Sequence, residues 1–299
     1  MKLTACINGV GLLGPGISDW QQGGRILRGE SPYTSAPTVL PVPACLPSAE
    51  RRRTGAIVRL ALAVGLEATT HAAADPAALP ALFTSSGGDG ANCHEICEVL
   101  AGTERALSPT RFHNSVHNAP SGYWGIATGA QAAANALCAF DASFGAGLLE
   151  ALTQVQVEHT AVLLIAYDAS YPAPLFSVRP IPDAFGVALV LAPDAAATTL
   201  ARLSVALSSA AAARLQDPAL EALRATIPAA RSLPLLAALA QRATRDVVID
   251  YLAPTSLTLR IEPCPLITSG SNSTSPTRAA CVCSMRCCPG MRSISAAAA

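Results

Sequence analysis

The sequence predicts an α/β fold in which helices cover a sheet. Short apolar segments of strand length alternate with longer segments whose apolar residues recur at the spacing of a helix packed on one side. The segment Thr160–Ala166 is apolar on both faces, as expected of a strand that is covered from two sides. With 299 residues, 51% of them hydrophobic and 13% charged, the chain is long and apolar enough to build a large core.

The N-terminal segment predicts one strand and one long helix. Leu3–Val10 has the composition of a strand. Ser48–Ala68 is predicted as a helix that has Ser48 as its N-terminal cap. The apolar residues that recur at helical spacing in it are Ile57, Leu60, Ala61, Val64 and Ala68.

A short buried strand, Ala81–Thr84, and a glycine-rich turn, Ser85–Gly90, come next. Asn92 and Glu95 form a capping-box pattern, which predicts that a helix begins there. The apolar side chains that this helix is expected to bury are those of Cys93, Ile96, Cys97 and Leu100. A polar loop then leads to a helix around Tyr123–Thr128.

The second half of the chain continues the alternation. Asn135–Phe140 is predicted as a buried strand, and the helix after it carries one apolar stripe. The stripe comprises Phe144, Leu148, Leu152 and Val155. Further strands are predicted at Thr160–Ala166, Gly186–Leu191, Arg202–Leu207, Asp246–Tyr251 and Ser256–Ile261, with helices within Pro218–Ala240.

The passage from strand to helix within Ala136–Glu150 is the strongest candidate for a functional site. A strand that turns sharply into a helix presents the residue at the turn to the helix N-terminus, where a nucleophile is favoured. The turn holds Asp141 and Ser143, and Cys138 precedes it. The residues alone leave open which of the three carries chemistry, and therefore whether the chain is an enzyme.

Two patterns approach known motifs without matching them. The segment Asp141–Gly145 differs from the hydrolase motif G-x-S-x-G because aspartate replaces the first glycine, and no histidine base follows His159. Residues 9–14 have the spacing G-x-G-x-x-G, but Pro15-Gly16 interrupts the helix start that would receive a pyrophosphate. We therefore expect no bound cofactor, and a hydrolase that uses Ser143 stays an alternative.

The chain has ten cysteines, but no metal site is expected. Cys93, His94 and Cys97 share one predicted helix and lack a fourth ligand. His113 and His117 lie in the polar loop without a carboxylate nearby, which favours a structural role. The four cysteines near the C-terminus have the spacing C-x-C-x3-C-C with no histidine after them: Cys281, Cys283, Cys287 and Cys288.

Composition excludes several classes of partner. The 20 basic and 20 acidic residues balance and form no basic stripe, so nucleic acid is not an expected ligand. No apolar run approaches the roughly 20 residues that a membrane helix needs, so no membrane insertion is expected. The N-terminus lacks the long apolar stretch of a secretion signal. We expect a cytoplasmic protein.

The order of several features resembles the N-terminal half of a β-ketoacyl synthase. These features are Gly9-Val10-Gly11 in the first strand, the helix in which Arg51-Arg52-Arg53 runs into Leu60-Ala61, the turn Ser85–Asp89, and the strand-turn-helix at Asp141. The segment His117–Gly129 is similar to the ketosynthase-like branch found in aryl polyene pigment clusters. The resemblance implies a thiolase-like layered fold over residues 1–262, essentially the N-terminal half plus a reduced C-terminal portion.

Residues 263–299 have a different composition, rich in Ser, Thr, Pro, Gly and Ala without periodicity. We expect a disordered, low-complexity tail or a product of out-of-frame translation.

The chemistry of the resembled family needs a cysteine nucleophile at the strand-to-helix turn, with two histidines and a lysine from the C-terminal half. The resemblance places Asp141 at the nucleophile position, and an aspartate is a poor acyl acceptor because its acyl product is a labile anhydride. Cys138 lies three residues earlier, where we expect a buried and protonated thiol. No histidine follows His159, and Lys2 is the only lysine.

The resemblance therefore implies a non-catalytic subunit of the chain-length-factor type. Such a subunit pairs with an active ketosynthase, works with an acyl carrier protein and shapes the acyl tunnel of a type II fatty acid or polyketide synthase. The strand Asn135–Phe140 and the helix before it are the expected interface, with Asp141 as a helix cap. Two alternatives stay open: an independent hydrolase or acyltransferase that uses Ser143 or Cys138, and a truncated synthase without function.

Overall fold

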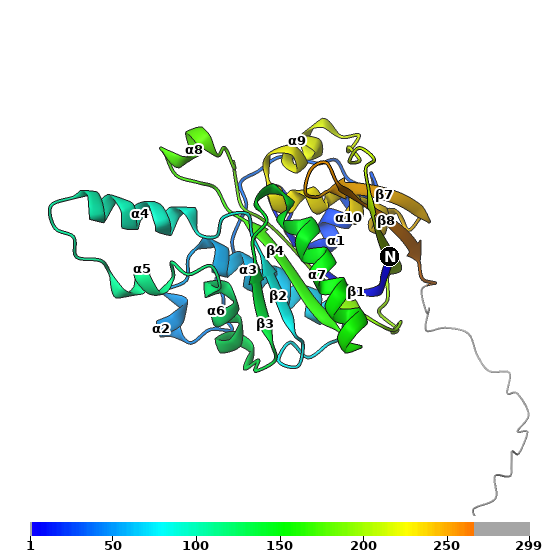
Figure 1. The fold of residues 1–299 in the computed structure, drawn as a ribbon, viewed down its shortest axis with the longest axis horizontal. Coiled ribbons are helices and arrows are strands. Elements are labelled where there is room, and N and C mark those ends of the chain that lie inside the picture. Colours follow the sequence, from blue (N-terminus) through cyan, green and yellow to red (C-terminus); the bar gives the residue numbers. More distant parts are fainter. Residues whose placement is uncertain (1, 266–299) are drawn as a thin grey trace, which may run out of the picture. The chain divides into compact units, whose positions relative to one another are not determined.

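One mixed sheet of eight strands, with helices on both of its faces, organises the chain (Figure 1). The computed structural model describes residues 2–265. The strand order is β3-β2-β4-β5-β1-β6-β8-β7. The strands are β1 (Leu3–Leu13), β2 (Ala81–Thr84), β3 (Ala134–Leu137), β4 (Val162–Asp168), β5 (Phe185–Ala192), β6 (Ala201–Ser208), β7 (Arg245–Asp250) and β8 (Ser256–Pro263).

The strand directions bring several strand ends to one edge of the sheet. β2 runs parallel to β3 and to β4, whereas β5 runs antiparallel to both β4 and β1. It follows that β1, β2, β3 and β4 all point the same way, so their carboxyl ends meet at the same edge. Beyond β1, the strands β6, β8 and β7 extend the sheet in antiparallel pairs.

Helices cover the two faces of this sheet, which gives three layers. The α-helices are α1 (Trp20–Leu27), α2 (Ser48–Arg51), α3 (Ala56–His71), α4 (Gly90–Ala101), α5 (Pro109–His113), α6 (Ala119–Thr128), α7 (Ser143–Glu158), α8 (Leu175–Val178), α9 (Pro218–Thr226) and α10 (Leu233–Gln241), and two 3-10 turns are η1 (Phe140–Ala142) and η2 (Pro228–Ser232). α3 packs on β1, β5 and β4 from one side, and α7 packs on β4, β1 and β2 from the other (Figure 1). None of the helices within residues 2–265 is long and apolar enough to cross a membrane.

β4 confirms the prediction of a strand that is apolar on both faces. All of its residues are buried. Val162, Leu164 and Ala166 belong to the core beneath α7, and Leu163 and Ile165 belong to the core beneath α3. The expected α/β layering therefore follows directly from this alternation, because each face of the strand supplies hydrocarbon to a different helix layer.

The glycine pattern near the N-terminus serves helix packing. Gly9 and Gly11 lie within β1 and face α3. A Cβ atom at Gly11 would stand 2.0 Å from the carbonyl oxygen of Val64, and one at Gly9 would stand 2.2 Å from that of Ala68. Only glycine lets the helix backbone approach the strand this closely.

The predicted long helix Ser48–Ala68 is wrong, because the structure contains two helices there. α2 is followed by a turn, and α3 begins only at Ala56 with the extended Gly55 before it. Ser48 is not a cap, since α2 has no side-chain cap. Gly55 is the last residue of the turn and packs closely on the Asp89 carboxylate, since a Cβ atom there would lie 2.8 Å from it. The turn interrupts the segment whose apolar spacing predicted one helix.

The expectations for the helix after the glycine-rich turn are also corrected. Asp89 caps α4 by accepting the N–H of Asn92, so the helix begins at Gly90 and not at Asn92. The side chains that were expected to be buried are largely outside the core: Cys93, Cys97 and Leu100 are exposed, and Ile96 is half-buried. Figure 1 shows the reason, because α4 and α5 project from the body of the domain.

Apart from the burial predicted for Asn135–Phe140, the other predicted strands and helices are confirmed, with ends that shift by a few residues. β2 has the predicted bounds, and the four stripe residues of α7 are all buried. Among the described elements, α1, α5 and α8 were not anticipated, and α5 lies where a polar loop was predicted.

Candidate functional site

The site is built on β3, which is an edge strand and not the buried strand that the sequence predicted. Within residues 2–265, β3 pairs with β2 and no strand pairs with its other edge. Ala134, Asn135 and Ala136 are exposed, and Leu137 is half-buried. The strand also ends at Leu137 rather than at Phe140. The apolar sequence of β3 is therefore an uncovered surface, which composition alone cannot distinguish from a buried strand.

A strained turn joins β3 to α7. Phe140 begins the turn η1 and has a φ of 51°, a left-handed backbone conformation that is uncommon for an aromatic residue. Its side chain is 60% exposed, although one face is covered by the guanidinium of Arg179 at 3.7 Å from the ring centroid. This cation–π contact holds the ring at the exposed edge of the sheet.

Asp141 is held by two arginines. Its Oδ1 accepts from Nη2 of Arg179 at 2.6 Å, and its Oδ2 accepts from Nη2 of Arg231 at 3.1 Å. Arg179 follows α8, and Arg231 lies in η2. The carboxylate therefore ties the turn to two distant segments of the chain. The expectation that Asp141 caps the helix is wrong, because neither η1 nor α7 has a side-chain cap.

Ser143 is the first residue of α7 and is buried, with 2% of its surface exposed. Its Oγ accepts the N–H of Ala139 at 3.0 Å and lies 2.6 Å from the carbonyl oxygen of Phe140. A second carbonyl oxygen, that of Ser85, lies 3.2 Å away. In the described residues no histidine hydrogen-bonds this hydroxyl, so the contacts of Ser143 are those of a residue that fastens the turn.

Cys138 is exposed, which corrects the expectation of a buried thiol. It follows the last residue of β3, and its Sγ lies 3.3 Å from the carbonyl oxygen of Ser86. The exposure has the same cause as that of β3, because the thiol stands at the uncovered edge of the sheet. His117 reaches the same region, with Nε2 at 3.3 Å from the carbonyl oxygen of Leu137.

Sequence reasoning missed Asp168, which lies at the end of β4 and is 3% exposed. Its Oδ1 accepts the N–H and the hydroxyl of Ser86 at 2.9 and 2.6 Å, and its Oδ2 accepts the N–H of Ala229 at 2.8 Å. Burial outweighs these hydrogen bonds and raises the pKa of Asp168 to about 6. The sequence does contain a signal for Asp168, namely a charged residue at the end of an otherwise apolar strand.

The arginines were also missed, because they lie far from the turn in the sequence. Asp141, Arg179 and Arg231 line a small cavity of about 190 Å³ together with Pro228. Two guanidinium groups around one carboxylate leave an excess of positive charge at the turn. The two ion pairs hold the turn in place.

The other candidate ligands do not gather into a metal site. Among residues 2–265, no group of three or more His, Cys, Asp or Glu side chains is arranged to hold a metal ion. His94 pairs with Glu98 at 3.3 Å on α4, and His113 ends α5. Cys281, Cys283, Cys287 and Cys288 lie outside the described residues.

Solved structures of ketosynthases share this fold. The complex of the ketosynthase ApeO with its chain length factor ApeC from Xenorhabdus doucetiae contains a chain that is 24% identical, with a TM-score of 0.65 and coverage of 86% of this chain and 99% of that chain. A chain of the ishigamide ketosynthase/chain length factor is 14% identical, with a TM-score of 0.67 and coverage of 88% and 100%.

A third likeness is to AntDE:AntF, a type II PKS acyl-carrier protein in complex with its ketosynthase, at 10% identity, a TM-score of 0.68 and coverage of 88% and 100%. At these identities the likeness establishes the thiolase-like layered fold. No curated protein matches the sequence. Residues 20–249, more than half of the chain, match the family described as "Beta-ketoacyl synthase, N-terminal domain". The chain therefore belongs to the β-ketoacyl synthase N-terminal domain family.

Proposed function

We propose that this chain is a non-catalytic subunit of the chain-length-factor type in a type II synthase that makes aryl polyenes or related fatty acids and polyketides. The observation that carries the proposal is the pairing of Asp141 with Arg179 and Arg231. We propose that Asp141 occupies the position at which the family has its nucleophile. A carboxylate engaged by two guanidinium groups is a weak nucleophile, since attack would require both ion pairs to break.

The remaining catalytic parts support the same assignment. Decarboxylation of a malonyl group in this family requires two histidines and a lysine from the C-terminal half. In this sequence no histidine follows His159, and Lys2 is the only lysine. We therefore propose that the partner subunit supplies the catalytic residues and that this chain helps to shape the acyl tunnel.

The uncovered edge of β3 is the proposed interface with an active ketosynthase. An edge strand presents unpaired N–H and C=O groups that a strand of another chain can bind. Apolar side chains surround it: Phe140 at the turn is 60% exposed, and Ile126 on the neighbouring α6 is 49% exposed. The similar solved structures are described as complexes of a ketosynthase with a chain length factor.

We further propose that the pair receives its acyl groups from an acyl carrier protein and shapes the acyl tunnel at the interface. One similar structure is described as an acyl-carrier protein in complex with its ketosynthase. The proposed location is the cytoplasm, a reducing compartment in which the six cysteines of the described residues stay free.

Co-expression with a candidate ketosynthase partner from the same organism tests the proposal. Ala133 and Leu137 direct their carbonyl groups to β2, so the alternation of the strand directs the N–H of Ala136 away from it. Ala136→Pro removes that outward N–H and is expected to abolish co-purification, whereas the control Ala136→Ser keeps the N–H and is expected to retain it. The proposal fails if the chain stays alone while the ketosynthase is fully active without it.

A further inference from the structure

A second cavity, to whose lining the Asp141 turn contributes no residue, has a volume of about 900 Å³. It occupies the space between α3 and residues 32–45, a proline-rich segment that we call the strap. The end of β1 and the start of α1 form its floor. The cavity therefore lies at the carboxyl end of β1. Its volume is that of a site for a small organic molecule.

The cavity is built by specific contacts and is not a gap left by loose packing. Tyr33 donates its hydroxyl to the carbonyl oxygen of Pro15 at 2.9 Å, and Arg59 on α3 donates to the carbonyl oxygens of Leu40 and Pro41. Thr38 holds the middle of the strap, with its N–H donated to Asp183 and its hydroxyl donated to the carbonyl oxygen of Ala184. These contacts hold the strap above the helix and keep the space beneath it open.

The walls are mostly hydrocarbon. One face of α3 contributes Leu62, Ala63 and Leu66, and β1 contributes Leu12 and Leu13. From the strap, Val39 and Val42 line the cavity while remaining 81% and 65% exposed. Apolar side chains that stand at a mouth rather than in a core favour an apolar ligand that would remove them from water.

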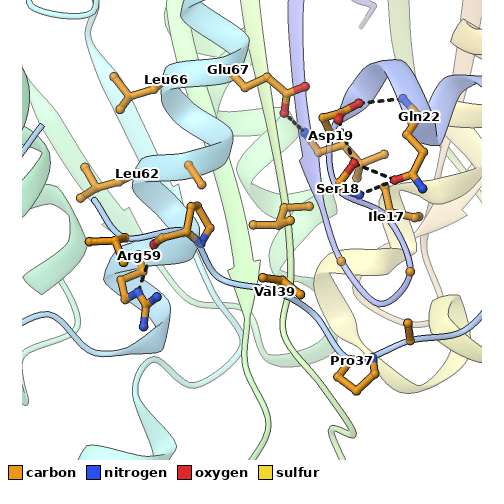
Figure 2. Close-up of a pocket in the computed structure, with 18 of the residues that line it drawn as sticks. Ile17, Ser18, Asp19, Gln22, Pro37, Val39, Arg59, Leu62, Leu66 and Glu67 are labelled. Atoms are coloured by element: carbon orange, nitrogen blue, oxygen red, sulfur yellow. Dashed lines mark hydrogen bonds between the residues drawn. The ribbon is translucent and has the colours of Figure 1, made fainter. Parts of the chain in front are cut away.

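One end of the cavity is acidic. Figure 2 shows Glu67 and Asp19 beside each other there, with Arg59 and Pro37 away from them. Glu67 accepts the N–H groups of Leu12 and Trp20 at 2.8 and 2.6 Å, and Asp19 accepts from Gln22 and Ser18. In residues 2–265 neither carboxylate forms an ion pair with a basic side chain.

These carboxylates select the head group of a ligand. A carboxylate has about four lone-pair sites, so each of the two retains acceptor capacity after its present hydrogen bonds. A head group that donates hydrogen bonds is therefore favoured at this end, and an anionic head is repelled. We propose that the cavity binds an elongated hydrocarbon ligand whose head group donates hydrogen bonds, an alcohol or an amine rather than a carboxylate. The site is separate from the Asp141 turn and independent of the proposed pairing.

Displacement of the neutral probe N-phenyl-1-naphthylamine from the full chain tests the proposal. The probe's fluorescence is expected to rise saturably, and dodecanol and dodecylamine are expected to displace it, with dodecanoate at least about tenfold weaker. The stronger of the two displacing ligands identifies the head group as neutral or cationic. Equal displacement by dodecanoate would overturn the proposal.

Variants locate the bound probe in this cavity. Ala63→Phe fills the wall and is expected to weaken probe binding at least about tenfold, whereas the control Ala222→Phe on an exposed face of α9 leaves it unchanged. Val39→Asp changes an exposed residue at the mouth of the cavity, away from the core, and is expected to weaken probe binding. This variant tests the location of the probe independently of whether Ala63→Phe folds.

Glu67→Gln tests the head-group preference. It removes the negative charge and is expected to strengthen binding of dodecanoate. Unchanged binding in folded Ala63→Phe and in Val39→Asp places the probe elsewhere and refutes the site.

Discussion

Arg179 contacts two adjacent residues of the turn, forming an ion pair with Asp141 and a cation–π contact with Phe140. Nη2 of Arg179 lies 2.6 Å from Oδ1 of Asp141, while the same guanidinium covers the ring of Phe140. Phe140 is the residue in the left-handed conformation. The ion pair and the cation–π contact therefore stabilise a backbone geometry that the sequence of the turn does not favour by itself.

Asp141→Asn is expected to lower the free energy of unfolding by about 1 kcal/mol, near the upper limit for ion pairs that keep some contact with water. The side chains of Asp141, Arg179 and Arg231 are 36%, 18% and 22% exposed, so water screens the two pairs only in part. Urea unfolding of the purified chain measures the effect.

The matched control is Asp246→Asn. Asp246 pairs with Arg260 at 3.2 Å, but their side chains are 56% and 46% exposed, so water screens this pair and a clearly smaller loss is expected. Equal losses in the two variants would mean that the Asp141 pairs have no special part in holding the turn.

Asp168 makes stability depend on pH. Burial raises its pKa in the folded chain from the usual 3.8 to about 6. The folded state then holds this proton more tightly than the unfolded state does, so the contribution is fully present below pH 3.8 and is lost as pH rises through about 6. The difference between the two pKa values corresponds to roughly 3 kcal/mol.

Asp168→Asn isolates this contribution from those of the other carboxylates. The free energy of unfolding of wild type minus that of the variant is expected to fall between pH 4 and pH 7, as measured by urea titrations at several pH values. A difference that rises over this range would mean that the hydrogen bonds from Ser86 and Ala229 outweigh burial and lower the pKa.

The layered core was predictable because it rests on local periodicity. β4 and α7 each carry their apolar pattern in a single short segment, and the structure buries those residues as expected. α4 and β3 carry similar apolar residues, yet both are largely exposed. Whether a segment is covered depends on the place of its element in the sheet or beyond it, and local sequence does not encode that place.

The site was predictable only in part, for a related reason. The turn at Asp141 has a local signal, the strand that passes into a helix through small residues. Its partners do not, because Arg179 and Arg231 lie 38 and 90 residues away in the chain. An arginine in a loop has the same appearance in the sequence whether it is solvated or paired with a distant carboxylate.

Gly11 of β1 allows a test of how closely α3 packs on the strand. Gly11→Ala is expected to destabilise the fold by about 3 kcal/mol, because the new methyl group overlaps the backbone of α3 and the overpacked layers must separate. Gly122→Ala is the control, since nothing lies within 4 Å of a Cβ atom there and the position is within α6. That control is expected to stabilise the chain by about 0.5–1 kcal/mol through helix propensity. Thermal unfolding compares the two, and a tolerated Gly11→Ala would mean that α3 does not pack as closely as described.

Asp141→Cys tests whether the missing nucleophile is the only catalytic deficiency. The variant places a thiol at the start of a helix, where the dipole favours the thiolate, so alkylation by iodoacetamide at residue 141 is expected. Condensation or malonyl decarboxylation with carrier-bound substrates is nevertheless expected to stay at the background rate. In the family, activation of the malonyl group needs two histidines and a lysine from the C-terminal half, and this chain has no histidine after His159 and only Lys2 as a lysine. Cys45, Cys93, Cys97 and Cys138 are also exposed, so the alkylated residues are identified by peptide mass spectrometry, and labelling at residue 141 is compared with that at these four. Turnover by Asp141→Cys without a partner would show that the chain holds an acid–base set that neither its sequence nor the contacts at the turn reveal.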